Sequence, residues 1–217
     1  MKLLLSLTAV SAVLLLIGSP VRAVPLPVAN PGFEDGLQQT AWQFGTPGQP
    51  CMSPGYAPRI YDATVGDSTN VHSGRYSLEL TLHGEVAWQV IQTAFPADCP
   101  IVLGAWIKMP VAGSVGTKVL TIQFNGLDSA GNCIWGRTSY PEFTGPYANW
   151  TWVSTLPFTS PSAVSRILIQ INTQNGGGCW PVCSYTWYVD DVTLDTGCLP
   201  TPAAGSTWGR LKAVYHE

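Results

Sequence analysis

Apolar and polar side chains alternate along much of the chain, and the segment YSLELTLH (76–83) shows the pattern clearly. Leu78, Leu80 and Leu82 fall on one face of an extended segment, with polar residues between them on the other. A period of two is typical of a strand with one buried face. We therefore predict a strand here, with the three leucines facing the core.

Several further segments have the same character, namely AWQVIQTAF, IVLGAWIKM, KVLTIQFNGLD, WTWVSTLPF, RILIQINTQ and YTWYVDDVTL. Each is rich in β-branched and aromatic residues and is bounded by Gly, Pro, Asn or Asp, which set turns. No helical stripe appears in the mature chain before its last dozen residues. The pattern predicts an all-β protein, an antiparallel β-sandwich of jelly-roll type with about nine strands. An immunoglobulin-like sandwich is the alternative.

The two ends of the chain differ from this strand-rich part. Residues 1–23 have a basic start at Lys2, an apolar run and a small-residue cleavage site, which is the layout of a secretory signal peptide. We expect a secreted domain over 24–196, with no membrane span after cleavage. Residues 197–217 read as a linker and a short amphipathic tail, which either frays or docks weakly, on the domain itself or on a surface or secretion partner.

Six cysteines lie in the expected mature chain. An even number in an exported protein predicts disulfides, and zinc is disfavoured because only one close-spaced cysteine pair is present. Cys179 and Cys183 form the simplest pair. We also pair Cys99, which precedes one strand, with Cys198, which follows the last, and Cys51 with Cys133.

The charge pattern and the missing motifs exclude several functions. The formal charge is only −3 and the ten basic residues are scattered, so we expect no nucleic-acid partner. The sequence contains no nucleophile elbow, no zinc-protease motif and no phosphate-binding glycine loop. We expect no catalytic residues. Nine tryptophans among few charges are instead typical of extracellular sandwiches and of sugar-binding faces.

Amide side chains are spaced two apart in two of the predicted strands. If Ile122, Phe124 and the isoleucines of ILIQIN face the core, the opposite face presents Gln123, Asn125, Gln170 and Asn172. Trp88 and Gln92 share a face of a third strand. These six residues are candidates for a polar, carbohydrate-binding floor, although any sandwich also needs polar outer faces.

Three further tryptophans are candidate stacking residues. Trp106 alternates with Gly104, and a small residue beside a large aromatic one is a way to make a groove. Trp135 and Trp180 lie in long cysteine-bearing segments that read as loops, where an exposed indole needs a neighbouring loop or a ligand to cover it. Trp42 is predicted to be core.

Acidic pairs stand near both ends of the domain, at Glu34–Asp35 and Asp190–Asp191. Neighbouring residues on a strand point to opposite faces. One acid of the first pair can therefore meet one acid of the second pair across adjacent strands. Carboxylates converging near backbone carbonyls suit calcium, which takes six to eight oxygen ligands. The alternative is that they accept hydrogen bonds from turn N–H groups.

Three motifs occur in a recognisable order: NPGFEDG followed by a tryptophan, HSGRYSLEL, and YVDDVTL in the last strand. Together they resemble the carbohydrate-binding modules of families four, nine, sixteen and twenty-two, which have galactose-binding-like jelly rolls. The resemblance implies structural calcium, held by Glu34 and Asp190 with backbone from residues 72–75. It also implies a polysaccharide or glycan partner.

Two functions follow from these observations. The first is a secreted, non-catalytic carbohydrate-binding module stabilised by calcium and disulfides. The second is a structural or adhesive extracellular protein that uses the same sandwich without a sugar site. Retention on polysaccharide separates the two.

Overall fold

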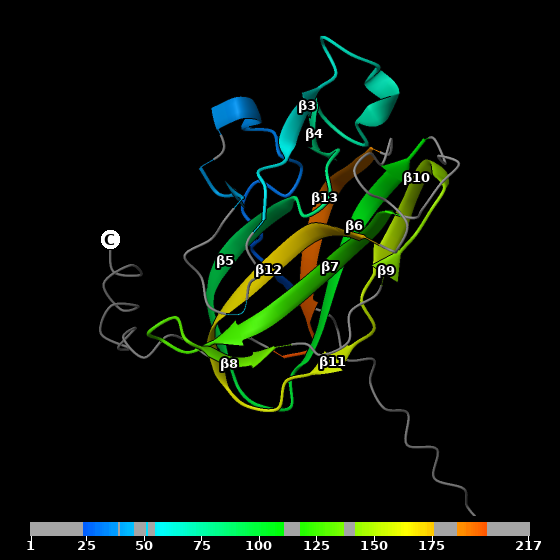
Figure 1. Ribbon diagram of the computed structural model, residues 1–217. Coiled ribbons are helices and arrows are strands. Elements are labelled where there is room, and N and C mark those ends of the chain that lie inside the picture. The colour runs from blue at the N-terminus through cyan, green and yellow to red at the C-terminus, as the bar shows by residue number, and fades with distance from the viewer. Residues whose placement is uncertain are drawn as a thin grey trace, which may run out of the picture.

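The alternating segments form two antiparallel β-sheets that pack face to face (Figure 1). The computed structural model describes residues 24–38, 40–45, 51, 55–110, 118–136, 142–175 and 186–198. Within these residues there is no α-helix, only the 3-10 turns η1 (Gly36–Gln38) and η2 (Ser68–Asn70). The antiparallel sandwich of jelly-roll type is therefore confirmed.

The seven-stranded sheet contains the first and last strands of the domain. Its order is β10 (Tyr147–Ser154), β6 (Pro100–Met109), β13 (Trp187–Thr196), β4 (Tyr76–Leu80) and β3 (Arg59–Asp62), with β1 (Val24–Leu26) on β13 and β11 (Phe158–Thr159) on β6. Because β13 lies at the centre, residues from both ends of the domain meet in this sheet.

The six-stranded sheet has the order β2 (Gln43–Phe44), β5 (Val86–Phe95), β12 (Val164–Asn175), β7 (Lys118–Leu127) and β8 (Cys133–Gly136), with β9 (Glu142–Phe143) on β7. Strand β12 pairs with β5 and β7 along most of its length. Side chains opposite one another on these three strands therefore form continuous rows across the sheet.

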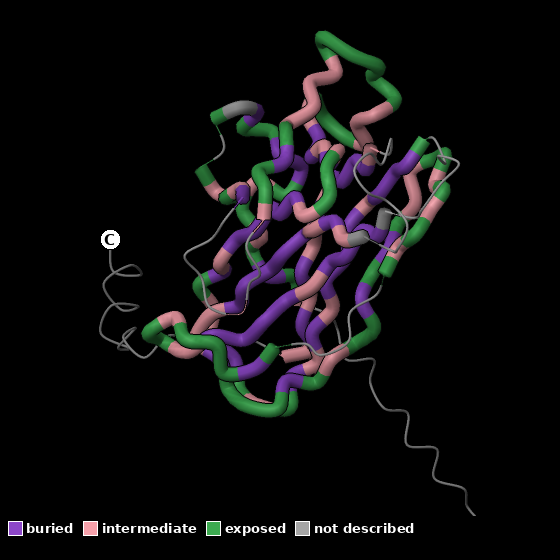
Figure 2. Tube along the Cα trace, in the orientation of Figure 1, coloured by how far each residue is buried: buried purple, intermediate pink, exposed green. Residues whose placement is uncertain are grey.

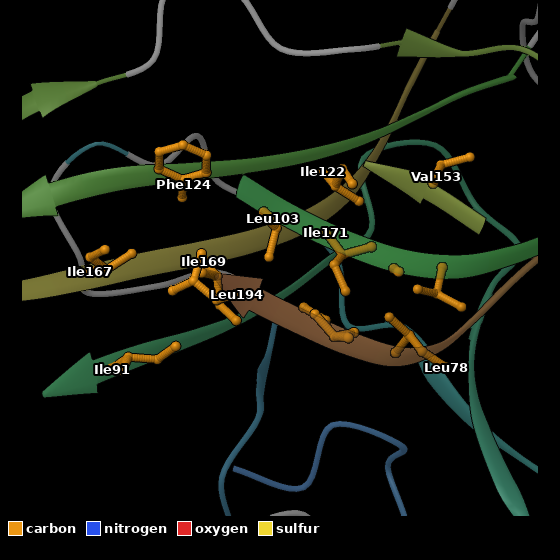
Figure 3. Packing of buried hydrophobic residues seen from close by; sticks show 14 of the residues in the cluster. Leu78, Ile91, Leu103, Ile122, Phe124, Val153, Ile167, Ile169, Ile171 and Leu194 are labelled. Atoms are coloured by element: carbon orange, nitrogen blue, oxygen red, sulfur yellow. The ribbon is translucent and has the colours of Figure 1, made fainter. Parts of the chain in front are cut away.

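The core lies between the sheets and is built from the predicted inward faces (Figure 3). Ile122 and Phe124 of β7 and Ile167, Ile169 and Ile171 of β12 are all buried. Figure 2 shows the burial concentrated along the long central strands. At about 25 cal/mol for each Å² of apolar surface buried, this interface is the main source of stability.

The predicted face of 76–83 is correct for two of its three leucines. Leu78 and Leu80 are fully buried, but β4 ends at Leu80 and Leu82 is 58% exposed. The chain turns away beyond Leu80, where Glu85 accepts a hydrogen bond from the Leu82 N–H. Alternation alone did not show where the strand ends.

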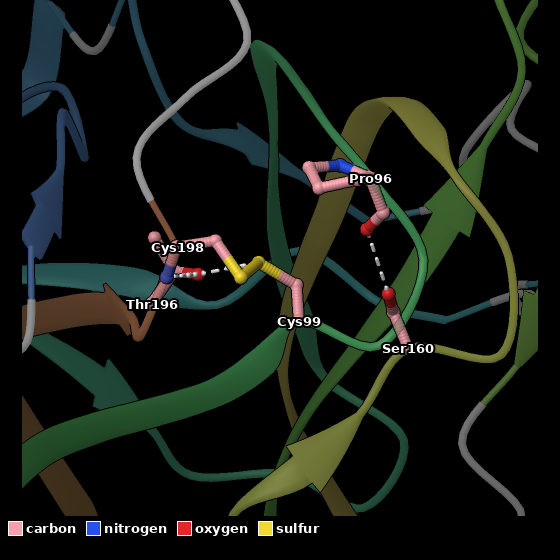
Figure 4. The surroundings of a disulfide bond; sticks show 5 residues. All are labelled: Pro96, Cys99, Ser160, Thr196 and Cys198. Atoms are coloured by element: carbon pink, nitrogen blue, oxygen red, sulfur yellow. Dashed lines mark hydrogen bonds between the residues drawn. A yellow bond between two sulfur atoms is a disulfide. The ribbon is translucent and has the colours of Figure 1, made fainter. Parts of the chain in front are cut away.

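Two disulfides form as predicted. Cys99–Cys198 joins the start of β6 to the end of β13, whose register pairs Ile101 with Thr196 (Figure 4). Cys51–Cys133 joins the segment after β2 to the start of β8. The predicted pair Cys179–Cys183 lies outside the described residues, as do the signal segment (1–23) and residues 199–217 of the predicted linker and tail. No helix in the described part of the chain is long and apolar enough to cross a membrane.

Candidate functional site

The outward face of the six-stranded sheet brings together most of the predicted amides. Gln170 of β12 pairs with Trp88 of β5 on one side and with Gln123 of β7 on the other, and Gln43 of β2 extends this row. Asn172 lies in the next row, opposite Thr121 and Val86. The row on the other side places Asn125 opposite Leu168. We call Trp88, Gln123, Asn125, Gln170 and Asn172 the amide floor.

Hydrogen bonds connect part of the amide floor across the strands. The Gln123 side-chain N–H donates to Gln170 Oε1 over 2.9 Å. The Thr121 hydroxyl donates to Asn172 Oδ1 on the neighbouring strand. These bonds fix the amides in place, and they engage the Gln170 oxygen but not its NH₂ group.

Three N–H donors of the amide floor are buried and lack a hydrogen-bond partner in the described structure: Trp88 Nε1, Asn125 Nδ2 and Gln170 Nε2. The three side chains are at most 5% exposed. A buried donor without an acceptor costs about 1–3 kcal/mol. Each of these donors therefore carries an uncompensated cost in the described fold, as Trp135 Nε1 does in the core.

A disulfide crosses the sheet beside these donors. Cys51 packs against an apolar cluster on the same face, formed by Val86, Trp88, Leu127 and Leu168. Its partner, Cys133, begins β8 at the opposite edge of the sheet from β2. The bond thus ties Cys51, which packs on this face beside Trp88, to the far edge strand of the sheet.

Gln92 is on the same face but does not join the amide floor. It lies four residues beyond Trp88 on β5, about 13 Å along the strand, and it is exposed opposite Arg166. The spacing correctly predicts its face, and its distance from the unpaired donors places it outside their cluster. Trp180 lies outside the described residues.

Trp135 is not a ligand-stacking residue in a loop; that prediction is wrong. It belongs to β8, pairs with Gly126 of β7 and packs in the core against Phe124 and Phe158. A Cβ on Gly126 would lie 2.3 Å from the indole, so the glycine provides the space that the ring fills. β8 is the short return strand of a hairpin after β7, and the turn residues 128–132 made the whole segment look like a loop.

Trp106 is half-buried on the outward face of the other, seven-stranded sheet. Its indole stacks on the His72 ring, with centroids 4.1 Å apart, and meets Trp152 edge-on at 5.8 Å. The space predicted above Gly104 is filled by the Trp152 indole, which comes within 2.4 Å of a Cβ built there. Trp106 is therefore part of an aromatic cluster remote from the amide floor.

The acidic residues at the two ends of the domain meet at one turn. Asp190 Oδ2 accepts hydrogen bonds from the His72 and Ser73 N–H groups, at 2.9 and 3.1 Å. Both Glu34 oxygens accept from Arg75 N at 3.0 Å. Gly74 has a φ of +66°, and a Cβ there would lie 2.3 Å from Glu34 Oε1, so only glycine fits between them.

The turn of residues 72–76 thus presents N–H groups, not carbonyl oxygens, to the two predicted calcium ligands. Asp191 adds a third carboxylate, held by His72 Nδ1 at 2.7 Å and by the Ser73 hydroxyl at 2.8 Å. Arg75 is paired with Asp62. Among the described residues, no three His, Cys, Asp or Glu side chains are grouped as a metal site.

Burial raises the pKa of Asp190 to about 7, and the neighbouring Asp191 charge acts in the same direction against the hydrogen bonds from the turn. Asp190 and Asp191 border a cradle beside Gly32. A Cβ there would lie 3.2 Å from Asp191 Oδ1 and 3.3 Å from Asp190 Oδ1, whereas Glu34 approaches it only with Cγ, at 3.8 Å. The Glu34 oxygens face the turn instead.

No family model matches the chain, and no curated protein matches it. Its fold is similar to that of the bacteriophage CBA120 tailspike protein 4 enzymatically active domain (19% identity, TM-score 0.47, covering 77% of this chain and 21% of that one). It is also similar to the MgGH51 α-L-arabinofuranosidase (14%, 0.48, 79% and 26%). A third similar structure is the CBM22-1 xylan-binding domain from Paenibacillus barcinonensis Xyn10C (12%, 0.42, 77% and 92%).

The chain spans about a fifth to a quarter of the first two of these proteins and nearly the whole of the third. Identities are below 20% and TM-scores below 0.5 in all three. Function is therefore argued from the site itself.

Proposed function

We propose that this protein is a secreted, non-catalytic module that binds a neutral polysaccharide at the amide floor. The single observation behind this proposal is the group of three buried donors, Trp88 Nε1, Asn125 Nδ2 and Gln170 Nε2, on one face of the sheet. A hydroxyl oxygen is the neutral acceptor that such donors bind, and a sugar ring carries several at fixed spacing.

The chemistry of the face supports a neutral ligand over a charged one. The amide floor contains no ionisable side chain, and Arg166, at the far end of β12, donates to the Ser129 carbonyl over 2.7 Å. Binding by amide and indole N–H groups depends little on ionic strength, because no pair of full charges is involved. Among the described residues these groups have no acid–base pair beside them, which supports a binding role without catalysis.

Affinity electrophoresis in gels containing xylan, β-glucan or mannan, with a cellulose pull-down, tests the proposal. We expect at least one polysaccharide to retain the protein, equally at about 0.1 and 0.5 M salt. The double variant Gln123→Met/Gln170→Met removes both amides of the bonded pair with little change in volume and should lose retention. Gln38→Met, an exposed amide in η1, is the matched control and should behave as wild type.

Failure to bind any of these polysaccharides would favour the second function, a structural or adhesive extracellular protein. In that case ordered water satisfies the donors of the amide floor, and the double variant changes stability alone.

We also propose calcium at the acidic turn, with Glu34 and Asp190 as the predicted ligands and Asp191 bordering the same cradle. The support is electrostatic: Asp190 is fully buried beside a second carboxylate, and a cation there would offset the cost of burying its charge. When bound, calcium would contribute stability and hold the 72–76 turn against β13.

A further inference from the structure

Trp152 of β10 is an exposed tryptophan that lies against a glycine. Its indole covers Gly104 of β6, where a Cβ would meet Cζ2 at 2.4 Å, Cη2 at 2.7 Å and Cε2 at 3.2 Å. The side chain is nevertheless 42% exposed. Because glycine has no side chain, the ring lies close against the sheet on one side and is open to solvent on the other.

Neighbouring rings hold this indole in place. Trp106 meets it at 63° and is stacked in turn on His72, whose Nδ1 is bonded to Asp191. Trp150, two residues before Trp152 on the same face of β10, contacts His72 and donates its indole N–H to the Thr69 carbonyl. A ring ordered before binding loses little conformational entropy when a ligand arrives.

Polar residues lie beside the open ring. Thr193 of β13 is directly opposite Gly104 in the register, and Asp195 is opposite Val102, one row further along the same outward face. Both residues therefore share the outward face with Gly104, to which they bring a hydroxyl and a carboxylate. Lys108, the cation on this face of β6, is bonded to Thr69.

We propose that Trp152, supported by Trp106 and Gly104, is a second saccharide-binding platform, which stacks on the face of one pyranose unit of a neutral glycan. One open indole covers about the area of a single sugar ring. It is far smaller than the roughly 800 Å² that each partner buries in a stable protein complex, so a sugar fits it and a protein surface does not.

The inference rests on the proposed function for its class of ligand, but it concerns the opposite side of the molecule. Trp152 belongs to the seven-stranded sheet and the amide floor to the six-stranded sheet, which form the two layers of the sandwich (Figure 1). One domain with a site on each outer face can link two polysaccharide chains, whereas a domain with one site cannot.

Two measurements test the platform. The first is cross-linking of soluble xylan, β-glucan and mannan, followed by turbidity and viscosity, and the second is affinity electrophoresis. We expect the wild type to cross-link the polysaccharide that retains it. Trp152→Ala should abolish cross-linking and weaken retention by about three- to ten-fold, while its circular dichroism stays unchanged. Tyr56→Ala removes a more exposed aromatic residue outside the platform (66% exposed) and is the matched control.

Gly104→Ala is a second variant, because its added methyl group would push the indole off the sheet while Trp152 itself remains. It should reduce cross-linking as Trp152→Ala does. If the wild type is retained but Trp152→Ala binds and cross-links equally well, the platform is wrong and the proposed function stands. If no polysaccharide retains the wild type, both proposals fail.

Discussion

The two outward faces of the sandwich use tryptophan in opposite ways. On the six-stranded sheet, Trp88 is buried, its ring is packed beside Cys51, and its N–H points to no acceptor. On the seven-stranded sheet, Trp152 is exposed. One side of its ring lies on Gly104 and the other is open to solvent. The first face offers directional hydrogen bonds and the second an open ring, so under the proposed function they would recognise different features of a sugar.

This difference predicts a difference in specificity. Hydrogen bonds from fixed donors distinguish the positions of hydroxyl groups, because a missing acceptor leaves a buried donor unpaired. Stacking on an indole tolerates many sugars, because most pyranoses have a C–H-rich face. We therefore expect the amide floor to select the glycan and Trp152 to add affinity for several.

The largest expected effect follows from removing the disulfide that crosses the amide floor. Cys51→Ser/Cys133→Ser opens a loop of 82 residues, and the free energy of unfolding should fall by about 4.5 kcal/mol because the unfolded chain regains entropy. Denaturation curves measure this change. Binding at the amide floor should weaken as Cys51 loosens beside Trp88, whereas stacking at Trp152 should persist. Equal losses at both faces would contradict the separation of the two sites.

A smaller effect is expected at the acidic turn, which lies in neither face. The pKa of Asp190 is raised to about 7, above the value of about 3.9 in an unfolded chain. Its contribution to stability is therefore complete below about pH 4 and is lost as the pH rises through 7, by up to about 4 kcal/mol. In a chelator, the melting temperature should fall between about pH 4 and pH 7 and level off above pH 7.

Calcium should reverse this fall at pH 8, because an ion that binds only the folded state stabilises it. Asp190→Asn removes the titrating group and should give both a flatter pH profile and no response to calcium. A wild-type melting temperature that does not respond to calcium at pH 8 would show that the carboxylates only hold the turn.

The smallest effect on stability is expected from Trp88→Phe. The substitution keeps an aromatic ring and removes an N–H that has no partner in the described fold, so the free energy of unfolding should change by no more than about 1 kcal/mol. Affinity for the glycan should nevertheless fall by about five-fold, the value of one hydrogen bond. Calorimetric titration and denaturation curves on the same samples separate the two quantities. A large loss of stability with unchanged affinity would make Trp88 a packing residue only.

Faces of strands were predictable from the sequence, and contacts between distant strands were not. The two-residue period placed Gln123 and Gln170 on one outward face because alternation is a local property. That the Gln170 amide lacks an acceptor depends on three strands and on Cys51, and no local pattern shows it. Trp135 was misassigned because the space above Gly126 is made by a different strand.

Trp152 was missed although the sequence holds a signal for it. Trp150 and Trp152 are two apart in WTW, so both fall on one face of β10, and Val153 faces the core. Gly104 is recognisable in the sequence as a neighbour of Trp106. Only the pairing of β10 with β6 shows that the Trp152 indole lies over it. The acids at 34 and 190 were correctly brought to the 72–75 turn by motif order, whereas the N–H groups of that turn required the structure.

The most direct test of the amide floor is the indole N–H signal of Trp88 in ¹H–¹⁵N correlation spectra, assigned by its loss in Trp88→Phe. The signal is followed while oligosaccharides from the retaining polysaccharide are added. Trp135 supplies an internal control, because its Nε1 is also buried without a partner but faces the core. We predict that the Trp88 signal shifts to a new, saturating position while that of Trp135 stays still. Saturating binding that leaves the Trp88 signal unmoved would contradict the account.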